Sequence, residues 1–163
     1  MATVGLLGAT IGGVAITTAA LPVAVVSAQA ATSSYVALPT AQRLLDTRAT
    51  LALNAGNTVS VKVTGEAPLP ATGTVVAAVL NLTVTGPAGV GYWTVWPHAS
   101  DRPEVSNINV DELQSLSGPF LALPNLVTVP VGADGVVDIY ASGGGHAIVD
   151  LLGYYTPAAS SAA

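Results

Sequence analysis

Side chains suited to ligand binding gather in one short polar run, at Trp96, His98, Asp101 and Arg102. An indole ring can stack on the apolar face of a sugar, and a guanidinium offers paired donors to hydroxyl or carboxylate groups. Trp93 and Trp96 are three residues apart in an expected strand, so their side chains point to opposite faces. One of them must pack in the core. We expect Trp96, which precedes the polar run, to lie at the surface as a candidate binding residue.

A second polar set is predicted to hold the scaffold together: Asp46, Arg48, Asn107, Asn109 and Asp150. A charge in so apolar a chain is most easily retained when paired, so Arg48 is expected to pair with Asp46 or Asp150 and to clamp the first strand to the last. Asn107 and Asn109 share one face of a strand and can fix its register through hydrogen bonds. The alternative is a ligand role, in which Arg48 binds a carboxylate or sugar hydroxyl groups and the two amides face a sugar or a calcium ion.

Catalytic and metal-binding constellations are weak in this sequence. Ser142, His146 and Asp150 have the residue types of a hydrolase triad, but no strand-to-helix nucleophile elbow accompanies them. His98 and His146 are the two histidines of the chain, and neither belongs to a recognised metal-ligand motif. The sequence therefore predicts no catalytic residue, no metal site and no cofactor.

The composition argues against several classes of partner and chemistry. Four basic residues are outnumbered by nine acidic ones, so the clustered Lys and Arg side chains that bind nucleic acid are missing. The absence of cysteine excludes disulfides, thiol catalysis and Cys-type zinc sites. Hydrophobic residues make up 51% of the chain but aromatic residues only 5%, which predicts a core of Val, Leu, Ala and Ile.

The two ends of the chain differ from its middle. Residues 1–30 have the layout of a secretory signal, an uncharged apolar stretch that ends in Ala28-Gln29-Ala30, although the positively charged start is missing. A membrane anchor and an ordered arm are the alternatives, since the stretch is long enough to span a bilayer. Residues 31–41 are expected to form a linker, and residues 157–163 a disordered tail.

The middle, residues 42–156, is predicted to be a single all-β domain. Its run at 58–64 alternates strictly between apolar and polar residues, as a half-exposed strand does. Many short strands with regular turn signals indicate an antiparallel β-sandwich, jelly-roll-like or immunoglobulin-like. The other β-prone runs are 74–85, 92–96, 105–110, 126–131, 136–140 and 146–155.

Two local predictions concern the connections between these runs. Asp134-Gly135 lies between two β-prone runs and predicts a hairpin, because this dipeptide favours the tight turns of hairpins. Residues 111–116 are the best candidate for a helix, which must be short because Gly118-Pro119 follows.

Several motifs in a fixed order resemble a module of exported and cell-surface actinobacterial proteins. They are RLLDTR (43–48), LNLTVTGP (80–87), GYWTVWP (91–97), RPEVSNIN (102–109) and the run 125–155, which ends in HAIVDLLGYY. The resemblance covers about residues 36–156. In that family the module is often repeated in tandem or accompanies hydrolase domains such as cell-wall amidases. The resemblance implies export, an all-β fold and an accessory role, and it carries no established catalytic activity over to this chain. This chain departs from the pattern at 110–125, where a local excursion is expected.

Together these features predict a secreted or cell-surface, non-catalytic binding or structural module at the cell envelope, with glycan as the candidate ligand. Its expected partners are cell-wall glycan, other surface proteins or a second copy of itself, and not nucleic acid. One alternative is an assembly subunit of a surface layer, filament or virion, with residues 1–30 as an ordered arm that pairs with a neighbour's sheet edge. The other is a cell-wall hydrolase.

Overall fold

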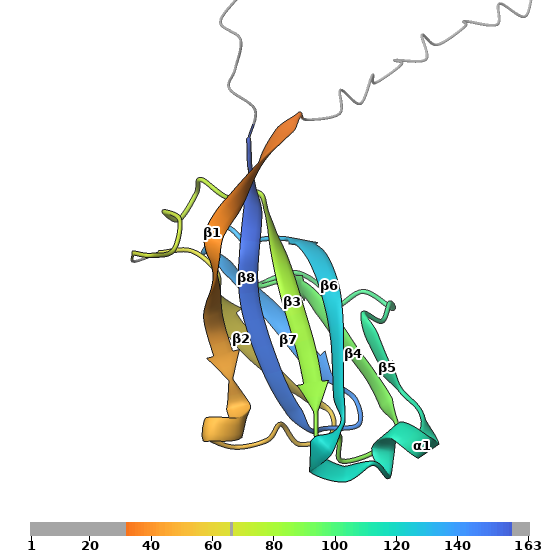
Figure 1. Ribbon diagram of the computed structural model, residues 1–163. Helices are drawn as coiled ribbons and strands as arrows, with labels where there is room; N and C mark the ends of the chain where they lie inside the picture. The colour runs from red at the N-terminus through yellow and green to blue at the C-terminus, as the bar shows by residue number, and fades with distance from the viewer. Residues whose placement is uncertain (1–31, 66, 158–163) are drawn as a thin grey trace, which may run out of the picture. The chain divides into compact units, whose positions relative to one another are not determined.

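Eight strands lie in the part of the chain that the computed structural model describes, residues 32–65 and 67–157 (Figure 1). Three short helices connect some of them, namely η1 (Thr47–Ala49), α1 (Glu112–Ser115) and η2 (Gly118–Phe120). None of these helices is long and apolar enough to cross a membrane. The strands are β1 (Ser33–Asp46), β2 (Asn57–Lys62), β3 (Ala77–Thr85), β4 (Gly91–Pro97), β5 (Ile108–Val110), β6 (Ala122–Pro130), β7 (Val136–Ala141) and β8 (His146–Pro157).

The strands pair as one long hairpin that is folded over on itself. β1 pairs with β8, β2 with β7, β3 with β6 and β4 with β5, and every pair is antiparallel. The resulting sheets have the orders β1-β8-β3-β6 and β2-β7-β4-β5, and they lie one in front of the other in Figure 1. This nested pairing in two four-stranded sheets is the jelly-roll topology. The all-β sandwich is therefore confirmed, and of the two topologies considered it is the jelly roll.

Aliphatic side chains fill the space between the sheets, as the composition predicts. Leu80, Leu82 and Val84 project from β3, and Val137 and Ile139 project from β7, each with no exposed surface. They alternate along their strands with residues of the outer faces. Burying a side chain of this size stabilises the fold by about 1.5–3 kcal/mol.

The linker prediction is wrong for residues 33–41, which belong to β1. Ser33 to Ala37 pair with the last residues of β8, and pairing resumes at Gln42 after a register shift. β1 is an edge strand, and nearly all of this first half is exposed. Because neither face of it is buried, the segment lacks the apolar alternation that marks a strand in a sequence.

The hairpin prediction at Asp134-Gly135 is also wrong, although the tight turn is present. The backbone N–H of Gly135 donates to the carbonyl of Gly132 over 2.8 Å, which closes the turn. The strands that it joins, β6 and β7, belong to different sheets. A turn signal predicts that the chain reverses its direction, but it does not tell which strand each arm then pairs with.

The short helix predicted at 111–116 is present as α1. The side chain of Asp111 accepts a hydrogen bond from the backbone N–H of Gln114, and the Gln114 side chain accepts one from the N–H of Asp111. This reciprocal pair is a capping box, which satisfies N–H groups that the first turn of a helix leaves free. Together with η2, α1 forms the excursion expected between residues 110 and 125.

Candidate functional site

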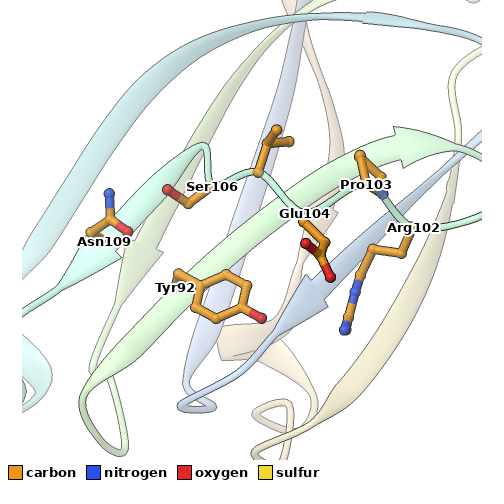
Figure 2. A pocket seen from close by; sticks show the side chains of 7 residues that line it. Tyr92, Arg102, Pro103, Glu104, Ser106 and Asn109 are labelled. Carbon is orange, nitrogen blue, oxygen red and sulfur yellow. The ribbon is translucent and has the colours of Figure 1, made fainter.

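A groove lies at the tip of the folded hairpin, where β4 and β5 meet the loop that joins them. Its volume is about 420 Å³, and it is lined by Tyr92, Asn109 and the loop residues 102–106. Figure 2 shows Tyr92 between Asn109 on one side and Glu104 and Arg102 on the other. Tyr92 and Asn109 are direct partners across β4 and β5, so they lie side by side on the outer face of the sheet.

An aromatic contact connects Tyr92 with β7, next to the groove. The rings of Tyr92 and Tyr140 have centroids 5.9 Å apart and are tilted by 52°. The Arg102 guanidinium carbon lies 3.7 Å from the centroid of the Tyr140 ring, the arrangement of a cation–π contact. Asn109, Tyr92, Tyr140 and Arg102 thus follow one another across the outer face.

The polar side chains of the groove make no hydrogen bond or ion pair to the part of the chain that the structure describes. In residues 32–65 and 67–157, the side chains of Glu104, Ser106 and Asn109 make no hydrogen bond, and Arg102 makes no ion pair. Most polar side chains elsewhere in this region are paired, and the described residues contain no buried polar side-chain atom without a partner. The groove therefore presents donors and acceptors to solvent around an exposed ring.

Asn107, in contrast, belongs to the scaffold as predicted. Its side-chain oxygen accepts a hydrogen bond of 2.7 Å from the backbone N–H of Val95, and its own N–H donates to the carbonyl of Trp93. Its carbonyl accepts a bond from the Asn125 side chain. The Asn107 side chain thus bonds the backbone of β4 just before β5 begins, where a strand residue would otherwise pair. The same prediction is wrong for Asn109, which is exposed and whose side chain makes no hydrogen bond to the described residues.

The prediction that Trp96 lies at the surface is wrong. Trp96 does point to the outer face, as its spacing from the core residue Trp93 requires, but only 6% of it is exposed. The loop after β4 folds back over this face: the indole N–H donates to the carbonyl of Ser100, and the Thr94 hydroxyl donates to the carbonyl of Val105. The covering loop, and not the core, buries the second tryptophan.

The four candidate binding residues therefore separate. Arg102 lines the groove, whereas Trp96 lies beneath the loop and Asp101 is exposed outside the lining. His98 turns toward β7 instead. Tyr92 and Tyr140 were not among the predicted binding residues. Tyr92 lies on the same face of β4 as Trp96, so the spacing could have indicated it. No local feature of the sequence connects Tyr140 with this loop.

His98 anchors the base of the covering loop. Its Nδ1 lies 3.0 Å from both carboxylate oxygens of Asp138, a residue that is only 8% exposed, and its Nε2 lies 3.8 Å from a carboxylate oxygen of Asp134. The hydrogen bond to Asp138, followed by the charges of Asp138 and Asp134, raises the pKa of His98. Asp138 also accepts a 2.6 Å bond from the Ser60 hydroxyl. Because the Ser60 hydroxyl bonds the carboxylate and not the imidazole, His98 is not placed to activate it.

The predicted pairing of Arg48 with Asp46 is present, but the prediction that Arg48 clamps the first strand to the last is wrong. Arg48 pairs with Asp46 through two bonds of 2.9 and 2.7 Å, which lowers the pKa of Asp46 well below its usual range. The clamp between the first and last strands is not Arg48 but Arg43, which bonds both Asp46 and Asp150. Arg43 lies directly opposite Asp150 across β1 and β8, a register that the sequence did not show.

The residues of the imagined triad are not assembled. The Ser142 hydroxyl accepts a bond from the backbone N–H of Tyr92, His146 contacts the Thr47 hydroxyl at 3.1 Å, and Asp150 binds Arg43. Each side chain thus has a structural partner of its own. Among the described residues, no three His, Asp or Glu side chains form a group that could hold a metal ion.

Comparisons with protein-family models, with curated proteins and with solved structures find no match to this chain.

Proposed function

We propose that this chain is a non-catalytic binding module exported to the cell envelope, and that its groove binds glycan. The observation that carries this proposal is the exposed Tyr92 ring, flanked by polar side chains that make no hydrogen bond to other described residues. Tyrosine offers a flat apolar face for the C–H groups of a sugar ring, while Asn109, Ser106 and Glu104 offer hydrogen bonds to its hydroxyl groups. Because these groups gain no internal bond, their placement on one surface supports a ligand role.

The fold is compatible with this proposal but does not select it. Jelly-roll sandwiches include lectin domains as well as capsid domains, so the topology alone serves both binding and assembly. The groove, and not the topology, therefore supports a binding function. Export is supported by the signal-like residues 1–30, which lie outside the described residues, and by the resemblance to exported modules.

Retention of the purified protein on isolated bacterial cell wall tests the glycan proposal. We expect Tyr92→Ala to weaken retention about tenfold, the effect of losing roughly 1.4 kcal/mol of stacking. Tyr35→Ala is the matched control, since Tyr35 is 49% exposed and also pairs with a second tyrosine, but on the other sheet. Equal retention of the two variants, or no retention of the wild type, would contradict the proposal.

The same samples distinguish binding from hydrolysis. A binding module leaves the wall intact, so we expect no soluble sugar or peptide in the supernatant above the level of a no-protein control. Release of such products, and its loss in His146→Ala or Asp150→Ala, would favour the hydrolase alternative. Export is tested separately by the mass of the secreted protein, which we expect to correspond to a chain that starts at Ala31.

An assembly subunit is the second candidate, because the 110–125 excursion carries exposed apolar side chains. Leu113, Leu116 and Phe120 are 79%, 77% and 95% exposed, and Phe120 is the one phenylalanine of the chain. Neighbouring apolar side chains that face water are unusual in a monomer and often mark a protein–protein interface. Sedimentation velocity tests this alternative. A monomer across the accessible concentration range favours the binding module, whereas oligomers that dissociate in Phe120→Ser favour assembly.

A further inference from the structure

We infer that the groove selects saccharides that carry a carboxylate group, and that Arg102 recognises this group. The inference rests on the proposed glycan-binding function and concerns the same site. The three arginines of the chain differ in their pairing. Arg43 and Arg48 are held by Asp46 and Asp150, whereas Arg102 has no carboxylate partner within residues 32–65 and 67–157.

Stacking fixes the Arg102 side chain without satisfying its donors. The guanidinium lies over the Tyr140 ring, with 3.7 Å between its carbon and the ring centroid. A cation–π contact uses no N–H donor, and no Arg102 N–H group makes a hydrogen bond to residues 32–65 or 67–157. A planar fork of donors that is already oriented matches the two oxygens of a carboxylate and loses little side-chain freedom when it binds one.

The order of the side chains defines how a ligand fits. Asn109 and Tyr92 are direct partners across two strands, Tyr140 stacks next to Tyr92, and Arg102 lies over Tyr140. A sugar ring on Tyr92 therefore has amide donors and acceptors at one side and the guanidinium at the other. A carboxylate attached to that sugar or to its neighbour falls within the region of Arg102.

Glu104 restricts this preference to ligands of low charge density. It lines the same groove, and the whole chain carries a formal net charge of −5. A densely charged polyanion would be repelled by Glu104 and by the net charge, since charges near a protein surface interact over about 10 Å. A saccharide with one carboxylate beside several hydroxyl groups satisfies both Arg102 and Glu104, because the hydroxyl groups can donate to the glutamate.

Chemical blocking of the wall carboxylates tests the inference with the full chain. Isolated cell wall is compared with the same wall after carbodiimide coupling of its carboxyl groups to ethanolamine, which converts them to neutral amides. We expect the wild type to bind the native wall about tenfold more tightly, as one charge-assisted bidentate contact allows. Arg102→Gln should bind the two walls equally, and Arg102→Lys should lose most of the preference.

Arg48→Gln is the matched control, because it removes the same charge from the chain but from η1, which does not line the groove. We expect it to keep the tenfold preference. Equal binding of both walls by the wild type, or a preserved preference in Arg102→Gln, would overturn the inference and leave the glycan proposal standing. Failure of the wild type to bind either wall would overturn the glycan proposal itself, and the inference with it.

A competition arm identifies the source of the carboxylate. A neutral oligosaccharide with a single uronic acid residue supplies one carboxylate among hydroxyl groups, its methyl ester supplies the same rings without charge, and an acidic oligopeptide supplies carboxylates without sugar. We expect the oligosaccharide with one uronic acid residue to displace the protein from native wall at lower concentration than the other two. If the acidic peptide competes best, the recognised group belongs to a peptide and the saccharide assignment is wrong.

Discussion

Asn107 and Asn109 are two residues apart at the start of β5, yet their amides have opposite roles. The Asn107 oxygen accepts a hydrogen bond from the backbone of Val95, whereas Asn109 lies beside Tyr92 and has no partner in the described part of the chain. Asn107→Ala leaves a buried N–H unsatisfied, so we expect it to lower the free energy of unfolding by about 1–3 kcal/mol. Asn109→Ala should change it by less than about 0.5 kcal/mol but should weaken retention on cell wall.

Urea denaturation of both variants, together with the retention assay, checks this separation. Each variant serves as the control for the other, because the same side chain is removed from the same strand face. A comparable loss of stability in the two variants would mean that Asn109 also belongs to the scaffold.

The site shows where sequence reasoning ends. Spacing correctly placed Trp93 and Trp96 on opposite faces, because side-chain parity on a strand is local. It could not show that the loop after β4 returns over the outer face and buries Trp96. Nor could it bring Tyr140 next to Arg102, since that contact depends on the pairing of β4 with β7, strands separated by β5 and β6. Arg102 was predicted, but the stacking surface around it was not.

The ion pair between Arg43 and Asp150 predicts a modest loss of stability when it is removed. The two side chains face each other across β1 and β8 and are 48% and 17% exposed. We expect Arg43→Gln to lower the free energy of unfolding by about 1 kcal/mol, the upper end of the range for exposed pairs, because Asp150 loses its partner and Asp46 keeps only Arg48. Arg48→Gln should have a smaller effect, since Arg48 pairs only within its own turn.

Thermal unfolding at low and high salt distinguishes the two variants. Added salt screens the pair, so the difference between the wild type and Arg43→Gln should shrink at high ionic strength. If Arg48→Gln is the more damaging of the two, the clamp has been assigned to the wrong arginine.

The fold was easier to predict than its connections. Alternation in 58–64 and 74–85 predicted strands that β2 and β3 confirm, because one face of each is buried against the core. The first half of β1 gave no such signal, as it lies at an exposed edge. The Asp134-Gly135 turn was recognised, but its strands pair with partners distant in the sequence, and local residue types do not determine such pairings.

Gly135 is predicted to be required at this crossing between the sheets. Its φ is +80°, and a Cβ placed there would lie 1.7 Å from the Thr64 hydroxyl oxygen. Gly73 has a similar φ of +85° with open space around it, so it isolates the cost of the backbone conformation. We expect Gly73→Ala to cost about 1–2 kcal/mol and Gly135→Ala clearly more, because the second variant adds a steric clash. Equal midpoints of urea unfolding for the two variants would show that Thr64 moves aside at no cost.

His98 predicts a dependence of stability on pH. Its contact with Asp138, reinforced by Asp134, raises its pKa above the ordinary value of 6.5 in the folded state. The folded state therefore binds the proton more tightly than the unfolded chain. This contribution is complete below pH 6.5 and is lost as the pH rises through the folded-state pKa. We expect the free energy of unfolding, measured in urea between about pH 5.5 and 8, to fall with rising pH, and His98→Gln to flatten the curve. Asp134→Asn should keep most of the slope, because Asp138 is the main cause of the raised pKa. An unchanged slope in His98→Gln would mean that another group causes the pH dependence of stability.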